Sequence, residues 1–351
     1  MAGPGTRDKD RKILHLIVEN YIRHGRPVSS RAIVETGRIA VSPATVRNAM
    51  VRLEELGYLT QPHTSAGRVP TDKGLRSYAE ALLSEPSYSA GDTAFVPDDG
   101  GSLPGDFETL LSQASRVLAD SSDNVGFVIS PNISRVQFDQ VRFVRIANQR
   151  IMVILVTPFH MVLTDTLDTL VPMTQSELDR TTQYINQNFR GRTLVAVRDL
   201  LLHELPRYRA RYEETISRLI DLVKAAVSRQ EGENRIFIQG TARLISKADL
   251  FDMSKLKALF RNLEEKANLV KLLSDFISLG RVKVLIGSEI DFPGVQDCSL
   301  VLSHYGTSHQ VLGSLGILGP KRIPYDSIIP LVDRVAKRLS RTIMTYGREV
   351  S

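Results

Sequence analysis

The clearest pattern of apolar and polar positions covers residues 42–70, SPATVRNAMVRLEELGYLTQPHTSAGRVP. Its apolar residues recur at spacings of four, three and three, which makes one stripe of a helix: Val46, Met50, Leu53 and Leu56. Ser42 can accept hydrogen bonds from backbone N–H groups one turn on, Pro43 suits the first helical position, and Gly57 suits a helix end. Two short extended pieces joined by a turn-rich segment follow. The pattern predicts a helix over 43–56 and then a two-stranded ribbon.

Helical periodicity also lies on both sides of this stretch. Residues 7–24 carry an apolar stripe, and Ser29 or Ser30 begins a short second helix. A fourth helix is expected to begin after Thr71. The order of helix, helix, turn, helix and ribbon is typical of a winged helix-turn-helix, so residues 1–84 are predicted to form a DNA-binding domain.

The rest of the chain changes period. Residues 85–106 are rich in Pro, Gly, Ser and Asp, which predicts a linker. Beyond it, short apolar runs predict a mainly antiparallel sheet with flanking helices, and a charged helical block interrupts that sheet. The fold class is therefore α+β multidomain, with a sheet domain at 107–173 and 235–351 and an inserted helical domain at 174–234.

The expected elements of these two domains are as follows. Strands are predicted at 124–130, 135–146, 150–157, 159–165, 235–240, 281–286, 298–304 and 310–318. Helices are predicted at 107–120, 207–230, 254–264, 266–279 and 326–346. The apolar side of the long 207–230 helix suits dimerisation, although packing on its own domain would also explain it. A homodimer would suit DNA with two-fold symmetry.

The distribution of charge indicates the kind of partner. The chain has 351 residues and a net charge of +6, and residues 1–80 hold 13 Lys and Arg against 8 Asp and Glu. Five of the six net charges therefore lie in the predicted DNA-binding domain, which indicates a polyanionic partner. The single cysteine excludes an intrachain disulfide and a cysteine-based metal site. No apolar signal core and no apolar run of 18 residues is present, so a cytoplasmic protein without a membrane span is expected.

The outward face of the 43–56 helix supplies the candidate site. Its capped end near Ser42 suits a phosphate, and the small residues Ala44 and Thr45 allow the backbone to approach a groove closely. Asn48 can pair with an adenine edge. The two arginines of this helix can pair with guanine or hold phosphate: Arg47 and Arg52.

Further contacts are expected outside that helix. Arg68 in the ribbon suits the backbone or a minor groove, while Arg31, Arg38 and His63 suit flanking phosphates. A capped amphipathic helix with surface arginines is common and is weak evidence alone. The order of elements together with the basic charge favours double-stranded DNA. Which of these residues contact bases rather than phosphates stays open.

Other chemistry is less well supported. The spacing Gly313-x-x-Gly316-x-x-Gly319-Pro320-Lys321 is not that of a phosphate-binding loop, so a strand and turn are favoured. His304 and His309, near Asp297 and Cys298, do not have the spacing of a metal site. No arrangement of catalytic residues stands out. We therefore expect neither an enzyme nor a cofactor or metal.

Two segments resemble the bacterial heat-inducible transcription repressor family, HrcA. The first is VSPATVRNAMVRLEELGYLTQPHTSAGRVPTDKGLRSYAEALL, and its HTSAGR turn is quite specific. The second, GSLGILGPKRIPYDSIIPLV over 313–332, is similar to the Gly-Pro-x-Arg…Tyr signature of that family. The two segments bracket most of the chain. The second helix, RAIVETGRIA with its extra Arg38, departs from the family pattern, and the 174–231 block matches only by position and type.

The resemblance carries several implications. Members have a winged-helix domain, a GAF-like domain and an inserted dimerising domain, and they bind an inverted-repeat operator upstream of chaperonin operons. The chaperonin GroEL keeps them active, so heat stress relieves repression. An alternative is a metabolite-sensing regulator, because GAF-like domains often bind small molecules. A pocket filled by side chains such as Phe143, Phe159 and Leu285 is favoured over a ligand. A third possibility is an adaptor that binds protein rather than DNA.

Overall fold

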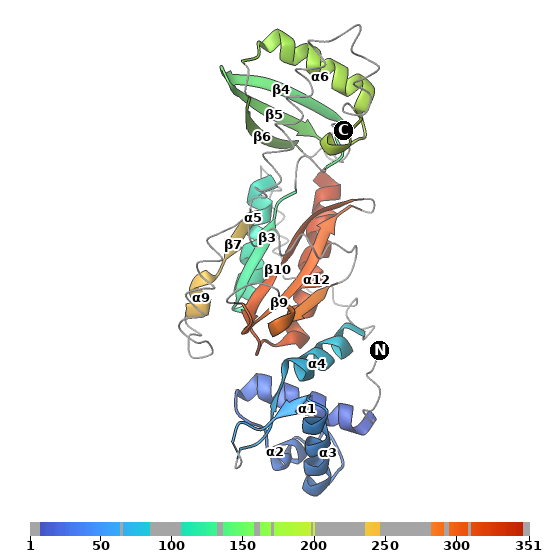
Figure 1. Ribbon diagram of the computed structural model, residues 1–351, viewed down its shortest axis with the longest axis vertical. Coiled ribbons are helices and arrows are strands. Elements are labelled where there is room, and N and C mark those ends of the chain that lie inside the picture. Colours follow the sequence, from blue (N-terminus) through green and yellow to red (C-terminus); the bar gives the residue numbers. More distant parts are fainter. Residues whose placement is uncertain are drawn as a thin grey trace.

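The computed structural model describes residues 8–63, 66–84, 107–131, 136–157, 162–169, 172–197, 199–200, 236–245, 282–290, 295–307 and 310–346. These residues form three parts that follow one another along the long axis of the molecule (Figure 1). A small helical part lies at one end, a helix-covered sheet lies in the middle, and a second sheet lies at the other end.

The helical part, which we call the reader, consists of four helices and a two-stranded ribbon. Its elements are α1 (Asp8–His24), α2 (Ser30–Glu35), α3 (Pro43–Glu55), β1 (Leu59–Thr60), β2 (Val69–Pro70) and α4 (Asp72–Ser84). These bounds confirm the helices and ribbon predicted from the sequence. Ser29 caps α2, because its Oγ accepts a hydrogen bond from the N–H of Ala32 at 3.2 Å.

The reader has one apolar core, in which α1, α3 and α4 contribute the main buried residues. Ile13, Ile17 and Leu53 are fully buried, and Leu75 is 2% exposed. One prediction within α3 is wrong: Leu56 is the C-terminal cap of the helix and is 39% exposed, so it is not part of the buried stripe. Ala49 lies in that stripe instead.

The middle part, which we call the body, is built on a five-stranded antiparallel sheet in the order β7-β3-β10-β9-β8. Its strands are β3 (Val125–Ile129), β7 (Ile236–Gln239), β8 (Lys283–Ile286), β9 (Cys298–Gly306) and β10 (Val311–Pro320). Its helices are α5 (Phe107–Ser122), the short α9 (Thr241–Ile245), the 3-10 turn η5 (Gly287–Glu289) and α12 (Tyr325–Tyr346). The predicted antiparallel sheet is therefore confirmed.

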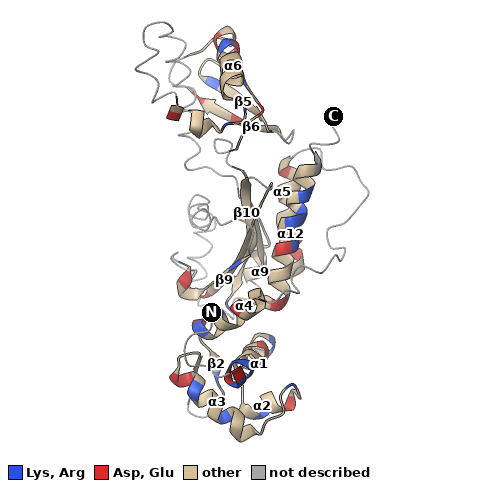
Figure 2. Ribbon diagram, turned by 90° about the vertical axis from the view of Figure 1, so that its right-hand side faces the viewer, with Lys and Arg blue, Asp and Glu red and all other residues tan. Residues whose placement is uncertain are grey.

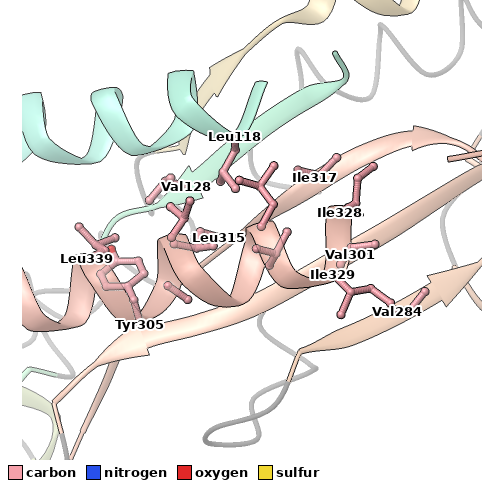
Figure 3. Close-up of a cluster of buried hydrophobic side chains, with 14 of the residues drawn as sticks. Leu118, Val128, Val284, Val301, Tyr305, Leu315, Ile317, Ile328, Ile329 and Leu339 are labelled. Atoms are coloured by element: carbon pink, nitrogen blue, oxygen red, sulfur yellow. The ribbon is translucent and has the colours of Figure 1, made fainter. Parts of the chain in front are cut away.

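Helices α5 and α12 cover one face of the five-stranded sheet. Figure 3 shows Leu118 of α5 and Ile328 of α12 meeting Val128, Leu315 and other strand residues in this layer. A Cβ at Gly126 would overlap the backbone of α5, so glycine allows the close approach of this helix to β3. The opposite face of the sheet is also apolar, and its cluster includes Phe127 and Leu302.

The third part, which we call the outer unit, is a separate three-stranded sheet with one helix. Its elements are β4 (Gln140–Ala147), β5 (Arg150–Val156), β6 (Val162–Asp168) and α6 (Gln175–Phe189). These strands pair only with one another, in the order β4-β5-β6, among the strands that the structure describes. The sequence assigned residues 107–173 to a single sheet domain. The strands of that segment in fact belong to two sheets, and the predicted boundary at residue 174 divides the outer unit.

Helix α6 runs along the edge of β4 and bonds to its backbone. Asn186 accepts a hydrogen bond from the Val141 N–H at 2.8 Å and donates to the Val141 carbonyl at 2.9 Å. Gln175 accepts from the Arg145 N–H at 2.9 Å. These side chains occupy backbone groups that would otherwise leave an open sheet edge. The helix begins at a capping box made by Thr174 and Glu177.

Several predictions fall outside the described residues. They are the linker at 85–106, the helix at 207–230 and the helices at 254–264 and 266–279. Phe143 was expected to fill a pocket of the sheet domain, but it lies in β4 and is buried in the outer unit, so this assignment is wrong. The described part of the chain contains no helix that is both long and apolar enough to cross a membrane.

Candidate nucleic-acid interface

Helix α3 presents a well-formed N-terminus. Ser42 has an extended backbone, and its Oγ accepts a hydrogen bond from the Thr45 N–H at 3.2 Å. The two hydroxyls of Ser42 and Thr45 also lie 2.9 Å apart. Pro43 occupies the first turn, where its missing N–H costs no hydrogen bond. The remaining N–H groups and the helix dipole make this end favourable for a phosphate.

The two faces of α3 differ sharply. One face is buried in the reader and consists of Val46, Ala49, Met50 and Leu53. The other face carries exposed residues at positions that follow one another along a helix: Ala44, Arg47, Asn48, Val51 and Glu55. Thr45 is half-buried at the margin. Four of the predicted contact residues, together with Ser42, therefore gather at the same end of one helix. Those four are Ala44, Thr45, Arg47 and Asn48.

Val51 was not predicted from the sequence as a site residue. It is 41% exposed although it is apolar, and it follows Asn48 on the same face of α3. An exposed apolar residue beside a polar reading face can contact the methyl group of thymine. The signal was present in the sequence, because Val51 falls outside the buried period of this helix.

Arg52, a predicted reading residue, is directed into the protein. Its Nη2 lies 2.6 Å from Asp10 Oδ1, and its Nε donates to Asp10 Oδ2 at 3.1 Å. The Asp10 side chain is only 6% exposed, whereas that of Arg52 is 40% exposed. The hydrogen bond that Arg52 donates to Asp10 is the main reason that the pKa of Arg52 is raised. This two-point ion pair ties α3 to α1.

Arg68 in the ribbon is also engaged within the reader. Its Nη2 lies 2.8 Å from Glu54 Oε2, and its side chain is 17% exposed. Its backbone exchanges two hydrogen bonds with Val28, at 2.8 and 2.9 Å. Arg68 therefore fastens the ribbon to α3 and to the connection between α1 and α2.

The three flanking candidates Arg31, Arg38 and His63 are all exposed, and Arg38 forms an ion pair with Glu19 of α1. Arg31 lies in the first turn of α2, and His63 lies in the segment that joins the ribbon strands. The chain near His63 is held by a hydrogen bond from the Ala66 N–H to the His63 carbonyl at 2.8 Å. Figure 1 places α2 and α3 at the end of the molecule farthest from the outer unit. Figure 2 shows basic positions along α3 at this end.

The alternative sites have structural roles or lack a metal-binding arrangement. Gly316 lies within β10, where a Cβ would overlap the Val301 carbonyl of β9, so the glycine-rich segment is strand rather than phosphate loop. His304 Nδ1 lies 2.8 Å from Ser314 Oγ on the neighbouring strand. Cys298 is buried, and burial raises its pKa to about 12. No group of three His, Cys, Asp or Glu side chains gathers as a metal site in the described ranges. His309 lies outside them.

Comparison with known families gives a consistent match. A family model described as "HrcA protein C terminal domain" matches residues 108–329. A protein of Geobacter sulfurreducens named "Heat-inducible transcription repressor HrcA" is 34% identical over 336 residues, which cover 96% of this chain and 98% of that protein. Proteins of the same name from Xylella fastidiosa and Xanthomonas euvesicatoria are also 34% identical, over 342 and 344 residues. The Xylella match covers 97% of both chains, and the Xanthomonas match covers 98% of both.

A solved structure is similar over nearly the whole chain. It is titled as the crystal structure of a hypothetical protein and is 26% identical, with a TM-score of 0.64. The match covers 97% of this chain and all of that one. The arrangement of reader, body and outer unit therefore has a counterpart in a solved structure.

Proposed function

Since this chain belongs to the HrcA family of heat-inducible transcription repressors, we propose that it binds an inverted-repeat operator of heat-shock, chaperonin-class operons as a homodimer. The observation that carries the proposal is the exposed face of α3 at its capped N-terminus. This role requires no catalysis, cofactor or metal. Family membership favours it over a metabolite-sensing regulator. Its place of action is the cytoplasm, where the operator DNA is found.

In this proposal the reader acts as a winged helix-turn-helix, with α3 in the major groove. Asn48 and Val51 contact base edges, while Ser42 and Arg47 hold the phosphate backbone or a guanine. Ala44 and Thr45 are small enough to let the α3 backbone approach the groove. Arg31 and His63 meet phosphates on either side. Arg52 and Arg68 act indirectly, because their ion pairs hold α3 and the ribbon in place.

We place the homodimer contact on the outer unit. In this proposal the inserted dimerising domain includes the strands β4–β6. About half of the side chains on the face of this sheet that points away from α6 are apolar. Val162 is 52% exposed and Ile146 is 50% exposed, and Val144, Met152 and Ile154 on the same face are half-buried. An apolar face of this kind marks an interaction surface. In this division the body acts as the GAF-like domain.

We further propose that the chaperonin GroEL maintains the active repressor, an expectation that the family resemblance supports. A repressor whose folded dimer is only marginally populated would lose its operator when chaperonin is drawn away by unfolded proteins. The test is operator binding after a brief heat treatment, with and without GroEL. Recovery of binding that does not depend on GroEL would contradict this part of the proposal.

The central proposal is tested by fluorescence anisotropy with two duplexes at several salt concentrations. One carries the inverted repeat found upstream of the chaperonin operon of the source organism, and the other carries the same bases in scrambled order. We expect specific binding to exceed non-specific binding by at least about 10³-fold, with affinity falling steeply as salt rises. Equal affinity for the two duplexes, measured with folded dimer, would reject the repressor assignment at this promoter.

A further inference from the structure

The first turn of α4 contacts the body through a carboxylate. Asp72 Oδ1 lies 2.8 Å from Lys321 Nζ, and Oδ2 of the same carboxylate accepts from that ammonium group at 3.0 Å. Asp72 also lies against η5, where a Cβ at Gly287 would overlap its carboxylate. Lys321 directly follows β10, and Gly287 directly follows β8. One aspartate of the reader therefore meets two turns of the body.

A second ion pair lies one helical turn along α4. Arg76 donates to Glu289 of η5 through Nε at 2.7 Å, and its Nη2 contacts the other carboxylate oxygen. Glu289 is itself fixed, because its Oε2 accepts from the Ile286 N–H at 2.9 Å. The side chains of Arg76 and Glu289 are 22% and 35% exposed, and burial lowers the pKa of Arg76. This pair is less accessible to solvent than an ordinary surface ion pair.

A third contact involves the residue after Lys321. The guanidinium of Arg322 lies against Gly25, at the C-terminal end of α1, where any Cβ would overlap it. Gly25 has a φ of +69°, which closes α1 in a left-handed conformation. The Lys321–Arg322 turn therefore contacts two helices of the reader, at the start of α4 and at the end of α1.

Both sides of this junction are rigidly supported. On the body, the Tyr325 hydroxyl donates to the Lys321 carbonyl at 2.8 Å and lies 2.6 Å from Ser299 Oγ in the interior. On the reader, Thr71 donates through Oγ1 to the Gly57 carbonyl at 2.7 Å. Lys73 donates to the Leu56 carbonyl at 2.8 Å, so the residues on either side of Asp72 grip the C-terminal end of α3.

We propose that Asp72, Arg76, Glu289 and Lys321 form a polar clasp that fixes the orientation of α3 relative to the body and thereby selects operator spacing. The proposal rests on the dimeric DNA-binding function proposed above. In a two-fold dimer the two α3 helices must match two half-sites, so the angle between reader and body determines which half-site separation fits. The four residues are positioning residues, because they act through α3 rather than on the DNA.

The choice of ion pairs rather than apolar contacts suits this role. Directional pairs specify one orientation, whereas apolar surfaces tolerate sliding. The clasp also joins turns that are far apart in the sequence, at 287–289 and 321–322, to one helix of the reader. Removing one pair should therefore loosen the reader without unfolding the core of either part.

The orientation itself can be measured without DNA. Spin labels are attached at Glu35→Cys in the reader and Gln113→Cys on α5, and labelled protein is diluted into unlabelled protein. Cys298 is buried and its pKa is about 12, so it does not compete for the label. We expect one narrow distance distribution in the parent protein, and a broadened or displaced distribution in Lys321→Met and in Arg76→Met. Lys337→Met, which breaks a partly exposed ion pair within α12, is the matched control and should leave the distribution unchanged.

Operator spacing is tested with the same variants. Duplexes carry the inverted repeat with its natural spacer or with a spacer changed by about five base pairs, which is half a helical turn. In Lys321→Met, the affinity ratio between the two duplexes should fall by about fivefold, the lower end of ordinary coupling between sites. Asp72→Asn, which keeps an acceptor at the start of α4, should lower the ratio in the same direction. Affinity for a single half-site should stay unchanged.

The outcomes separate the clasp from the repressor function. If the parent protein binds no inverted repeat, the function is wrong, and the distance measurement still decides whether the clasp holds the reader. The clasp is refuted if the parent protein selects a spacing and all three variants behave like the parent. In that case Lys321→Met, Arg76→Met and Asp72→Asn would keep the parent's distance distribution and its affinity ratio between the two duplexes.

Discussion

Arg52 on α3 and Asp10 on α1 form a two-point ion pair in which the arginine remains partly exposed and the aspartate is almost fully enclosed. The pair explains why an arginine in the reading helix need not read DNA. Its carboxylate has little access to water, so removal of Arg52 leaves a buried charge without its partner.

Arg52→Ala should therefore destabilise the reader by about 1–3 kcal/mol, a value reduced by the solvent exposure of the arginine. Arg47→Ala, an exposed substitution on the same helix, should change stability by no more than about 0.5 kcal/mol. Urea unfolding of both variants measures the difference. If Arg52→Ala has full stability and a relaxed sequence preference, its role is at the DNA after all.

Asn48 and Arg31 should differ in the kind of DNA binding that they support. Asn48→Ala removes a base contact and should reduce discrimination at one A·T pair by about 1–3 kcal/mol. Arg31→Ala removes a phosphate contact and should weaken binding to all sequences alike, with a salt dependence smaller by about one ion. Anisotropy against single-base operator variants, repeated at several salt concentrations, distinguishes the two. Equal losses on every duplex for both variants would contradict the assignment of the reading face.

Val51 provides a test that depends on the structure rather than on the sequence pattern. Val51→Ser removes an exposed apolar side chain, so stability should change by no more than about 0.5 kcal/mol. Operator affinity should fall, and the loss should disappear when the contacted thymine is replaced by uracil, which lacks the methyl group. Anisotropy on paired thymine and uracil duplexes measures this. An unchanged affinity for the thymine duplex would remove Val51 from the interface.

The raised pKa of Cys298 should make the stability of the fold fall at alkaline pH. Burial raises this pKa to about 12 from an ordinary value of 9.0, so the folded thiol stays protonated where the unfolded thiol ionises. Its contribution to stability is fully present below pH 9 and is lost as pH rises towards 12. Between pH 7 and pH 10, the free energy of unfolding should fall by about 1 kcal/mol more in the parent protein than in Cys298→Ala. Equal falls in urea unfolding would contradict the raised pKa.

The sequence predicted local structure well where one signal governed it. The cap at Ser42 and the glycine after α3 fixed the bounds of that helix to within a residue. Prediction from the sequence failed for features that depend on long-range contacts. The partner of Arg52 lies 42 residues away, and the partner of Lys321 lies 249 residues away, so neither could be read from helical periodicity.

The division of the strands between two sheets could not be predicted for the same reason. Both β3 and β4 can be recognised as strands from the sequence, yet β3 pairs with β7 and β10, whereas β4 pairs with β5. Strand periodicity identifies which side chains share a face but not which strand lies alongside. Helix α6 bonds to the edge of β4 through Asn186. The sequence pattern of such a helix does not differ from that of a helix in a purely helical insertion.

The outward face of β4–β6 yields a prediction on assembly. Val162→Lys and Ile146→Lys each place a charge at a position that is about half exposed, so the outer unit should remain folded. In the dimer the same position would bury that charge without a partner, and dissociation should follow. Analytical ultracentrifugation at micromolar concentration should show a dimer for the parent protein and a monomer for either variant. Gln113→Lys on α5 is the control and should stay dimeric. If both variants remain dimers with unchanged affinity, the subunits meet through another surface.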